Sequence, residues 1–254
     1  MKWIKKIFAS GTAIVLCEDH VPDRETFSEK LDEVGKYFSF VKLDDAVKNL
    51  RNGTLSNHAA FCLENPRKSA FQNAVPELID RNIPFTLFLN VDCIGLNRLP
   101  VQEEIAIYKS HYAQALADDS TPEELSWVSP QDAEARLASW RQRIGPFPIE
   151  AQDPTRYFAT WGQILEIPPQ MVEYGMHLST KPEGKLVLRH EEALDFIRIQ
   201  TRQAVRHAFS PYKVSPFEKS LNQLGLQAVI CRQSQGEVSL KTNVFDIPIW
   251  NLES

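Results

Sequence analysis

The stretch of residues 59–90, AAFCLENPRKSAFQNAVPELIDRNIPFTLFLN, constrains the fold of this chain more than any other. Two short apolar runs, AAFCL and FTLFL, flank a segment in which apolar residues recur at near-helical spacing between Ser69 and Asp80. Continuous apolar runs of this length are typical of strands that are buried on both faces of a parallel sheet. The stretch therefore predicts a strand, a helix and a parallel strand, which together form one right-handed crossover unit.

The same patterns predict further elements on both sides of this unit. Strands are predicted at residues 13–17, 38–43 and 227–231. Helices are predicted from a cap at Asp23 or Thr26 to about residue 36, and at 44–50, 100–117, 130–143, 188–204 and 215–224. A chain of 254 residues lies within the single-domain range of a barrel. We therefore expect one domain over residues 1–254, with a helical insertion at about 91–159.

The composition of the chain limits which binding partners and which cellular compartment are expected for the protein. Apolar residues make up 43% of the chain, which is enough to build a sizeable core. The formal net charge is −5 and the basic residues are not clustered, so nucleic acid is not an expected partner. The four cysteines, Cys17, Cys62, Cys93 and Cys231, lack the spacing of a metal knuckle. At least three lie in apolar runs, which predicts buried free thiols and suits a reducing compartment.

The first 17 residues imitate an export signal. Lysines near the start are followed by an apolar run up to Cys17, but no small-residue cleavage site follows it, and Glu18-Asp19 comes at once. The run has the length of one barrel strand and is too short to span a membrane. We therefore expect a cytoplasmic protein without a membrane span.

Three segments of the central stretch carry a resemblance. Residues 61–65 (FCLEN), 76–78 (PEL) and 83–89 (IPFTLFL) are similar to the motifs T-F-D-D-G, P-x-L and I-P-A-T-F-F-V. These motifs belong to the NodB-homology domain of polysaccharide deacetylases, carbohydrate esterase family four. The resemblance implies an α/β fold, a distorted (β/α) barrel with seven or so parallel strands.

Later segments resemble further motifs of the same family, in the same order. They are residues 160–164 (TWGQI), 172–177 (VEYGMH), 206–212 (RHAFSPY) and the closing segment 244–251. His20-Val21 partly matches the Y-H-x-V that follows the first strand in deacetylases of surface-polysaccharide gene clusters. This match points to the type of the family that serves bacterial surface polysaccharide, O-antigen or lipopolysaccharide, biosynthesis.

The residues that would carry the family's chemistry are altered. Enzymes of this family use a divalent metal as Lewis acid and water activator. Leu63 stands at the position of the catalytic base, and Lys181 stands where a second histidine ligand is expected. Glu64 and His177 would remain as ligands, fewer than the usual three of a catalytic zinc site. We therefore favour no metal and a salt bridge between Glu64 and Lys181, with zinc or another divalent metal on Glu64 and His177 as the alternative.

Polar side chains gather at the predicted carboxyl ends of the strands, where barrels of this kind have their active sites. The catalytic candidates are Glu64, His177, His20 and Asp19, and the substrate-binding candidates are Asn90, Asp92, Lys181 and Tyr212. In the family, the amide of the tyrosine that Tyr212 matches helps to form the oxyanion hole. A buried, hydrogen-bonded histidine is the alternative role of His20. We expect Glu64, His177 and Lys181 to form one cluster with His20 close by.

These residues leave three functions open. The first is a polysaccharide-deacetylase homologue with an altered site that acts on an N-acyl sugar of a bacterial surface polysaccharide. If active, it would be a hydrolase of carbon–nitrogen bonds. The second is a pseudoenzyme, a non-catalytic carbohydrate-binding or scaffold partner of a glycan-synthesis enzyme. The third is a metal-independent C–N bond hydrolase.

Overall fold

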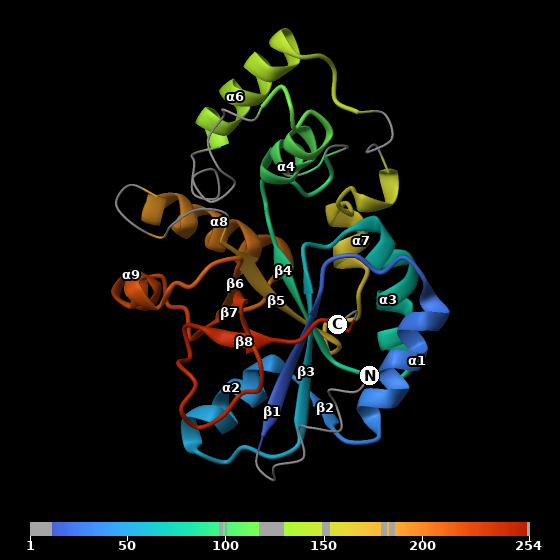
Figure 1. Ribbon diagram of the computed structural model, residues 1–254. Helices are drawn as coiled ribbons and strands as arrows, with labels where there is room; N and C mark the ends of the chain where they lie inside the picture. The colour runs from blue at the N-terminus through green and yellow to red at the C-terminus, as the bar shows by residue number, and fades with distance from the viewer. Residues whose placement is uncertain are drawn as a thin grey trace.

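The computed structural model describes residues 12–96, 99, 101–116, 130–148, 153–178, 182 and 186–252 (Figure 1). The strands are β1 (Ala13–Glu18), β2 (Ser39–Val41), β3 (His58–Glu64), β4 (Phe85–Leu89), β5 (Val172–His177), β6 (His207–Ser210), β7 (Ala228–Gln235) and β8 (Ile247–Ile249). The α-helices are α1 (Arg24–Gly35), α2 (Leu43–Asn52), α3 (Lys68–Asp80), α4 (Val101–His111), α6 (Pro130–Arg143), α7 (Trp161–Leu165), α8 (Leu186–Thr201) and α9 (Glu218–Gln223). Two 3-10 turns, η3 (Pro154–Arg156) and η4 (Ser215–Phe217), complete the described elements.

The strands form one parallel sheet in the order β1-β3-β4-β5-β6-β7-β8, and β2 pairs with the first half of β3 on the edge opposite to β1. The last strand returns to the first, since Trp250 N donates to Val15 O at 2.9 Å and Cys17 N donates to Trp250 O at 3.0 Å. The sheet is therefore nearly closed, with helices around it. This confirms the predicted distorted (β/α) barrel.

The central unit β3–α3–β4 has the predicted order and parallel pairing. Elsewhere the predicted boundaries need correction. The helix predicted at 100–117 ends at His111, and the one predicted at 215–224 begins as the 3-10 turn η4. The last predicted strand continues beyond Cys231 to Gln235. Helix α3 ends at Asp80, and Asn82 then takes a left-handed conformation with φ of 55°.

Successive side chains of each strand point alternately into the barrel and out toward the helices, so the core has an inner and an outer layer. The side chains of Val15, Cys62 and Ile230 fill the inside of the barrel, and residues of α2 close its amino-terminal end (Figure 1). Their neighbours in sequence, such as Phe61 and Leu63, pack outward against the surrounding helices. Burial of each large apolar side chain contributes about 1.5–3 kcal/mol. At the carboxyl ends of the same strands, polar side chains occupy the inward positions.

Gly175 in β5 is required by close packing. A Cβ atom at this position would lie 2.4 Å from the ring of Phe88 and 2.9 Å from the carbonyl oxygen of His207. The missing side chain lets Phe88 enter the barrel, where its ring lies 5.8 Å from that of Phe209. This aromatic layer forms the floor beneath the carboxyl ends of the strands.

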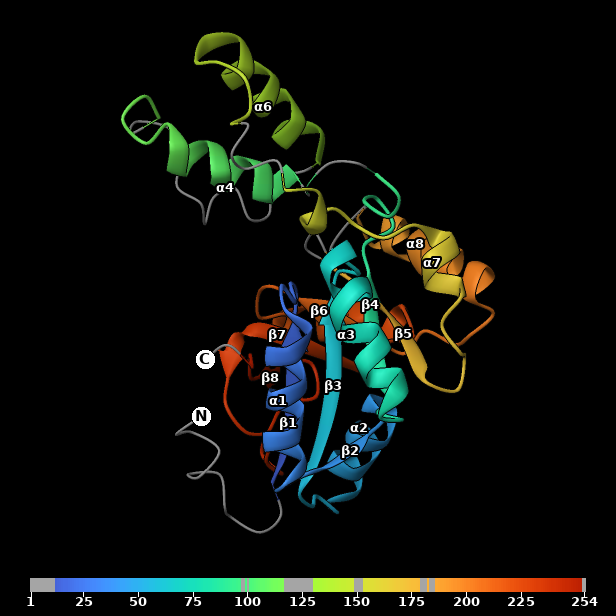
Figure 2. The same ribbon diagram turned by 90° about the vertical axis from the view of Figure 1, so that its right-hand side faces the viewer.

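Helices α4 and α6 lie in the sequence range where a helical insertion was predicted. They pack on each other around a core of their own, which includes Tyr108, Leu137 and Trp140. Figure 2 shows the pair beyond the carboxyl ends of β3 and β4, away from the body of the barrel. The pair therefore stands on the side of the barrel where parallel barrels carry their sites.

All four cysteines are buried and unpaired, as predicted. Among the described residues, no helix is both long enough and apolar enough to cross a bilayer.

Candidate functional site

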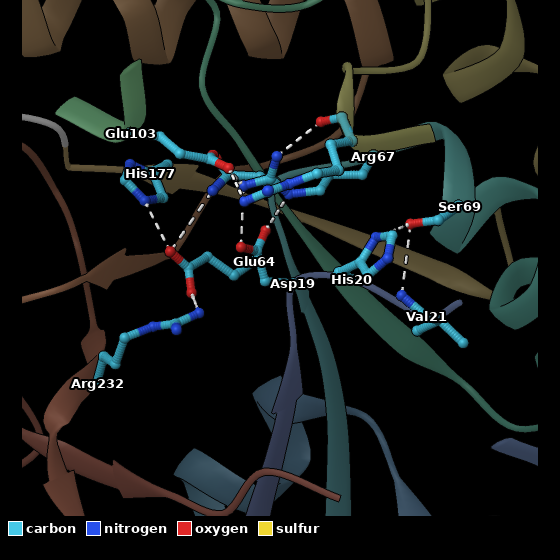
Figure 3. A network of polar contacts seen from close by, with 11 residues as sticks. Asp19, His20, Val21, Glu64, Arg67, Ser69, Glu103, His177 and Arg232 are labelled. Atoms are coloured by element: carbon cyan, nitrogen blue, oxygen red, sulfur yellow. Dashed lines mark hydrogen bonds and ion pairs between the residues drawn. The ribbon is translucent and has the colours of Figure 1, made fainter. Parts of the chain in front are cut away.

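Five polar side chains converge at the carboxyl end of the barrel because they continue the inward face of their strands. Glu64 and His177 are the last residues of β3 and β5, and Arg232 follows the inward Ile230 in β7. Asp19 and Asn90 follow directly after β1 and β4. We call this group the mouth cluster, and Figure 3 shows its members Asp19, Glu64, His177 and Arg232.

Glu64 is the centre of the mouth cluster. His177 Nε2 lies 3.2 Å from Glu64 Oε1, and Arg232 Nη2 donates to the other carboxylate oxygen, Oε2. The Glu64 side chain is only 7% exposed. Burial alone raises the pKa of this carboxyl group, but the hydrogen bond to His177 and the charge of Arg232 together hold the pKa below its ordinary value. Glu64 is therefore a carboxylate at neutral pH.

Phe209 supports both partners of Glu64. Its ring stacks on the imidazole of His177 with centroids 5.4 Å apart and an interplanar angle of 26°. The Arg232 guanidinium carbon lies 5.8 Å from the centroid of the same ring, within the range of a cation–π contact. The orientations of His177 and Arg232 are thus fixed by a shared aromatic side chain as well as by Glu64.

Asp19 is held by a second arginine. Arg67, at the start of α3, donates to both carboxylate oxygens of Asp19 at 2.6 and 2.9 Å. It also donates to Glu103 of α4 at 2.7 Å and to the carbonyl oxygen of Arg156 in η3 at 2.6 Å. Burial and the neighbouring Glu64 charge raise the pKa of Asp19, although Arg67 opposes the shift. Both oxygens of this catalytic candidate are therefore engaged by Arg67.

His20, which was expected close to the cluster of Glu64 and His177, makes its hydrogen bond elsewhere. Its Nδ1 lies 2.7 Å from the hydroxyl oxygen of Ser69, which also accepts a hydrogen bond from Val21 N at 3.4 Å. Figure 3 shows His20 turned toward Ser69 on the far side of Asp19 from His177. The side chain is hydrogen-bonded, as the alternative prediction has it, but it is half-buried and not buried.

A cavity of about 210 Å³ opens beside the mouth cluster, between the ends of β4 and β5 and helix α8. Asn90, Asp92 and His177 line it together with Arg189 and Phe196 from α8. Asp92 is fixed by Arg189 at 2.6 Å, and its amide lies 3.3 Å from Asn90 Oδ1. Three of the site residues predicted from the sequence therefore face one cavity.

The predicted role of Tyr212 is changed by its contacts, and that of Lys181 is not described. The amide of Tyr212 donates to Ser210 Oγ at 3.1 Å, and this hydroxyl donates to the carbonyl oxygen of Tyr212 at 2.6 Å. The amide is therefore engaged in a turn and does not offer an open oxyanion hole. Lys181 lies outside the described residues, and so does its predicted salt bridge with Glu64.

The residues at the mouth do not fit the metal that the resemblance implies. Leu63, at the position of the catalytic base, is fully buried in the helix-facing core. Glu64 and His177 are donors of the right kind, but the Arg232 guanidinium already occupies a carboxylate oxygen of Glu64. Within the described ranges, no group of three or more His, Cys, Asp or Glu side chains is arranged to hold a metal ion.

Sequence reasoning missed Arg232 and Arg67, two arginines of the site. Arg232 follows the predicted strand 227–231 and shares the inward face of Ala228 and Ile230. Continuing that alternation by one step would have placed it at the mouth. No comparable local pattern marks Arg67, because its partners come from three distant segments.

No protein-family model matches the chain, and neither does any curated protein. Solved structures do match over almost its whole length. IcaB from Ammonifex degensii aligns with a TM-score of 0.61 at 13% identity, covering 95% of this chain and 92% of IcaB. The deacetylase PplD of Streptococcus pyogenes, solved with acetate, aligns with a TM-score of 0.60 at 9% identity over 96% of this chain and 93% of PplD. The deacetylase domain of BpsB from Bordetella bronchiseptica aligns with a TM-score of 0.58 at 13% identity, over 95% and 96%.

These matches define the class of fold. The chain has the NodB-like barrel of the polysaccharide deacetylases, as its motifs predicted.

Proposed function

We propose that this protein acts on an N-acylated sugar of a bacterial surface polysaccharide, through the Glu64, His177 and Arg232 side chains. One observation carries the proposal. These three side chains converge beside a cavity of about 210 Å³ at the active-site end of a deacetylase-type barrel. PplD, with the same fold, is a deacetylase and was solved with acetate.

The geometry assigns a role to each of the three side chains. Glu64 orients the imidazole of His177 through Nε2, which leaves Nδ1 as the nitrogen that accepts a proton. His177 Nδ1 and Arg232 Nε are buried, and neither has a hydrogen-bond partner among the described residues. A buried polar group without a partner is costly, so both atoms are suited to meet a polar group of a ligand. Arg232 would donate to the acyl oxygen, where negative charge develops.

The proposed reaction is hydrolysis of the amide. The oxygen of a water molecule attacks the acyl carbon while the water proton passes to His177. The C–N bond then breaks, and the proton passes to the departing sugar nitrogen. The products are the free amino sugar and the carboxylate of the acyl group.

A second candidate function is a non-catalytic carbohydrate-binding or scaffold partner of a glycan-synthesis enzyme. Two sets of contacts favour this function, because they engage groups that a catalytic role would need to be open. Both oxygens of Asp19 are held by Arg67, and the Tyr212 amide is held by Ser210. In that case the same cavity would bind the sugar without cleaving it.

Incubation with N-acetylglucosamine oligosaccharides tests both candidates. Release of acetate that is lost in His177→Ala supports the hydrolase. Binding by calorimetry without release, again weakened by His177→Ala, supports the binding partner. His111→Ala, an exposed histidine of α4, is the matched control. A protein that neither binds nor cleaves these sugars would contradict the proposed function.

We further propose that the protein serves O-antigen or lipopolysaccharide assembly in the cytoplasm. Four unpaired, buried cysteines support a reducing compartment. Fractionation of the native host checks the location, and recovery with the outer cell layers would contradict it.

A further inference from the structure

We propose that Arg232 is a built-in cation that compensates Glu64 and excludes a divalent metal from the mouth cluster. The site is then metal-free because of one arginine, rather than only because a ligand is missing. This inference stands apart from the proposed function, since it concerns the charge of the protein's own side chains and needs no sugar.

The first step of the argument is the charge of Glu64. Its carboxylate is almost fully buried at the end of β3, and a buried carboxylate is retained only when it is paired and hydrogen-bonded. Oε1 meets His177 and lies 3.5 Å from Asn65 Nδ2. Oε2 meets Arg232. Both oxygens therefore have nitrogen partners from the chain itself.

The second step is the permanence of the Arg232 charge. The Glu64 carboxylate that Arg232 Nη2 contacts favours the charged form of the guanidinium. An arginine guanidinium does not lose its proton in proteins, so it cannot turn into a neutral ligand as a histidine can. A divalent cation on Glu64 would have to displace it or stand beside a permanent positive charge.

The third step is placement. Arg232 reaches Glu64 from β7, while the ring of Phe209 lies beneath its guanidinium. Arg232 is partly exposed, whereas Glu64 is buried. The arginine therefore holds one oxygen of a buried carboxylate from the side of β7.

Zinc chloride is the probe that tests this inference. We would measure bound zinc per chain after dialysis, and the zinc-induced shift of Tm, for the wild type, Arg232→Gln and Arg232→Lys. We expect no stoichiometric zinc in the wild type or in Arg232→Lys, which keeps the positive charge. We expect Arg232→Gln to gain a zinc-induced rise in Tm, and to lose it again when His177→Ala is added.

Arg206→Gln is the matched control, because Arg206 pairs with Asp44 at the opposite end of the barrel, at 3.0 Å. It should not respond to zinc. One zinc per wild-type chain that disappears in Glu64→Gln would overturn the inference. So would an Arg232→Gln protein that ignores zinc as the wild type does.

Stability gives a second measurement if Arg232→Gln folds poorly. The double variant Glu64→Gln with Arg232→Gln should unfold at a higher temperature than Arg232→Gln alone, because it no longer buries an uncompensated carboxylate. A double variant whose two losses simply add would show that the pair is not coupled, and would also overturn the inference.

Discussion

Three carboxylates at the active-site end of this barrel each contact one arginine. The pairs are Glu64 with Arg232, Asp19 with Arg67, and Asp92 with Arg189. Each pair brings together one positive and one negative charge, so none of them leaves a net charge at the site. A mouth of compensated charges suits a neutral, polar ligand better than a strongly charged one. This agrees with an N-acylated sugar as the proposed ligand.

Asp19→Asn tests the second of these pairs. The substitution removes the charge that faces Arg67, whose side chain is only 4% exposed. Hydrogen bonds to charged groups contribute about 1.5–3 kcal/mol, so we expect a loss of that size in the free energy of unfolding by denaturant. Asp80→Asn is the control, because Asp80 forms an exposed pair with Arg24 and exposed pairs contribute little. Equal losses in the two variants would show that Arg67 does not depend on Asp19.

Among the helices, α2 has a separate role because it closes the end of the barrel opposite to the mouth. Its residues Leu43, Val47 and Leu50 enter the inner core. Asp44 in its first turn is also tied to the barrel. His207 Nε2 of β6 lies 3.3 Å from Asp44 Oδ1, and Arg206 donates to Oδ2 at 3.0 Å. Apolar packing and the polar contacts of the buried Asp44 side chain therefore both hold α2 against the barrel.

Asp44 makes the stability of this closure depend on pH. The close contact of its carboxylate with His207, followed by the contact with Lys48 and the charge of Arg206, holds the pKa of Asp44 well below its ordinary value. The unfolded chain therefore binds the proton more readily than the folded one, and stability falls as the pH drops below about 4, the ordinary pKa of aspartate. We expect Asp44→Asn to be less stable at neutral pH and to lose less Tm between neutral and acid pH than the wild type.

Asp45→Asn is the control for this measurement, because Asp45 is exposed on the same helix. Its variant should keep the acid dependence of the wild type. If Asp44→Asn shows the same fall in Tm with acid as Asp45→Asn, the role assigned to Asp44 is wrong.

The elements were largely predictable because they are local. Strand β4 matches the predicted run FTLFL, and α6 begins and ends where the pattern placed it. The partner of Glu64 was not predictable in this way. Arg232 lies 168 positions further along the chain, and only the closure of the sheet brings the two together. Sequence reasoning correctly required a cation for the buried carboxylate and named Lys181 from a motif position, which lies outside the described residues.

At the scale of the whole molecule, the barrel and the α4–α6 pair are joined through one ionic network. Arg67 belongs to the barrel, Glu103 belongs to α4, and Arg156 of η3 contacts the same carboxylate. Helices α4 and α6 have their own core and their own ion pair, Arg141 with Glu104 at 3.0 Å. The two acids are adjacent in sequence, but one links α4 to the barrel and the other links α4 to α6.

Because Glu103 links α4 to the barrel and Glu104 links α4 to α6, substituting each of them in turn tests how the helix pair is held over the mouth. Glu103→Gln should loosen the attachment of α4 and α6 to the barrel while their own core persists. We expect faster proteolytic cleavage next to the helix pair, with only a small change in the Tm of the barrel, because α4 and α6 have a core of their own. Glu104→Gln should instead speed hydrogen exchange within α4 and α6 and leave the attachment intact. If both variants open the same segments at the same rate, the insertion does not depend on Glu103 for its position.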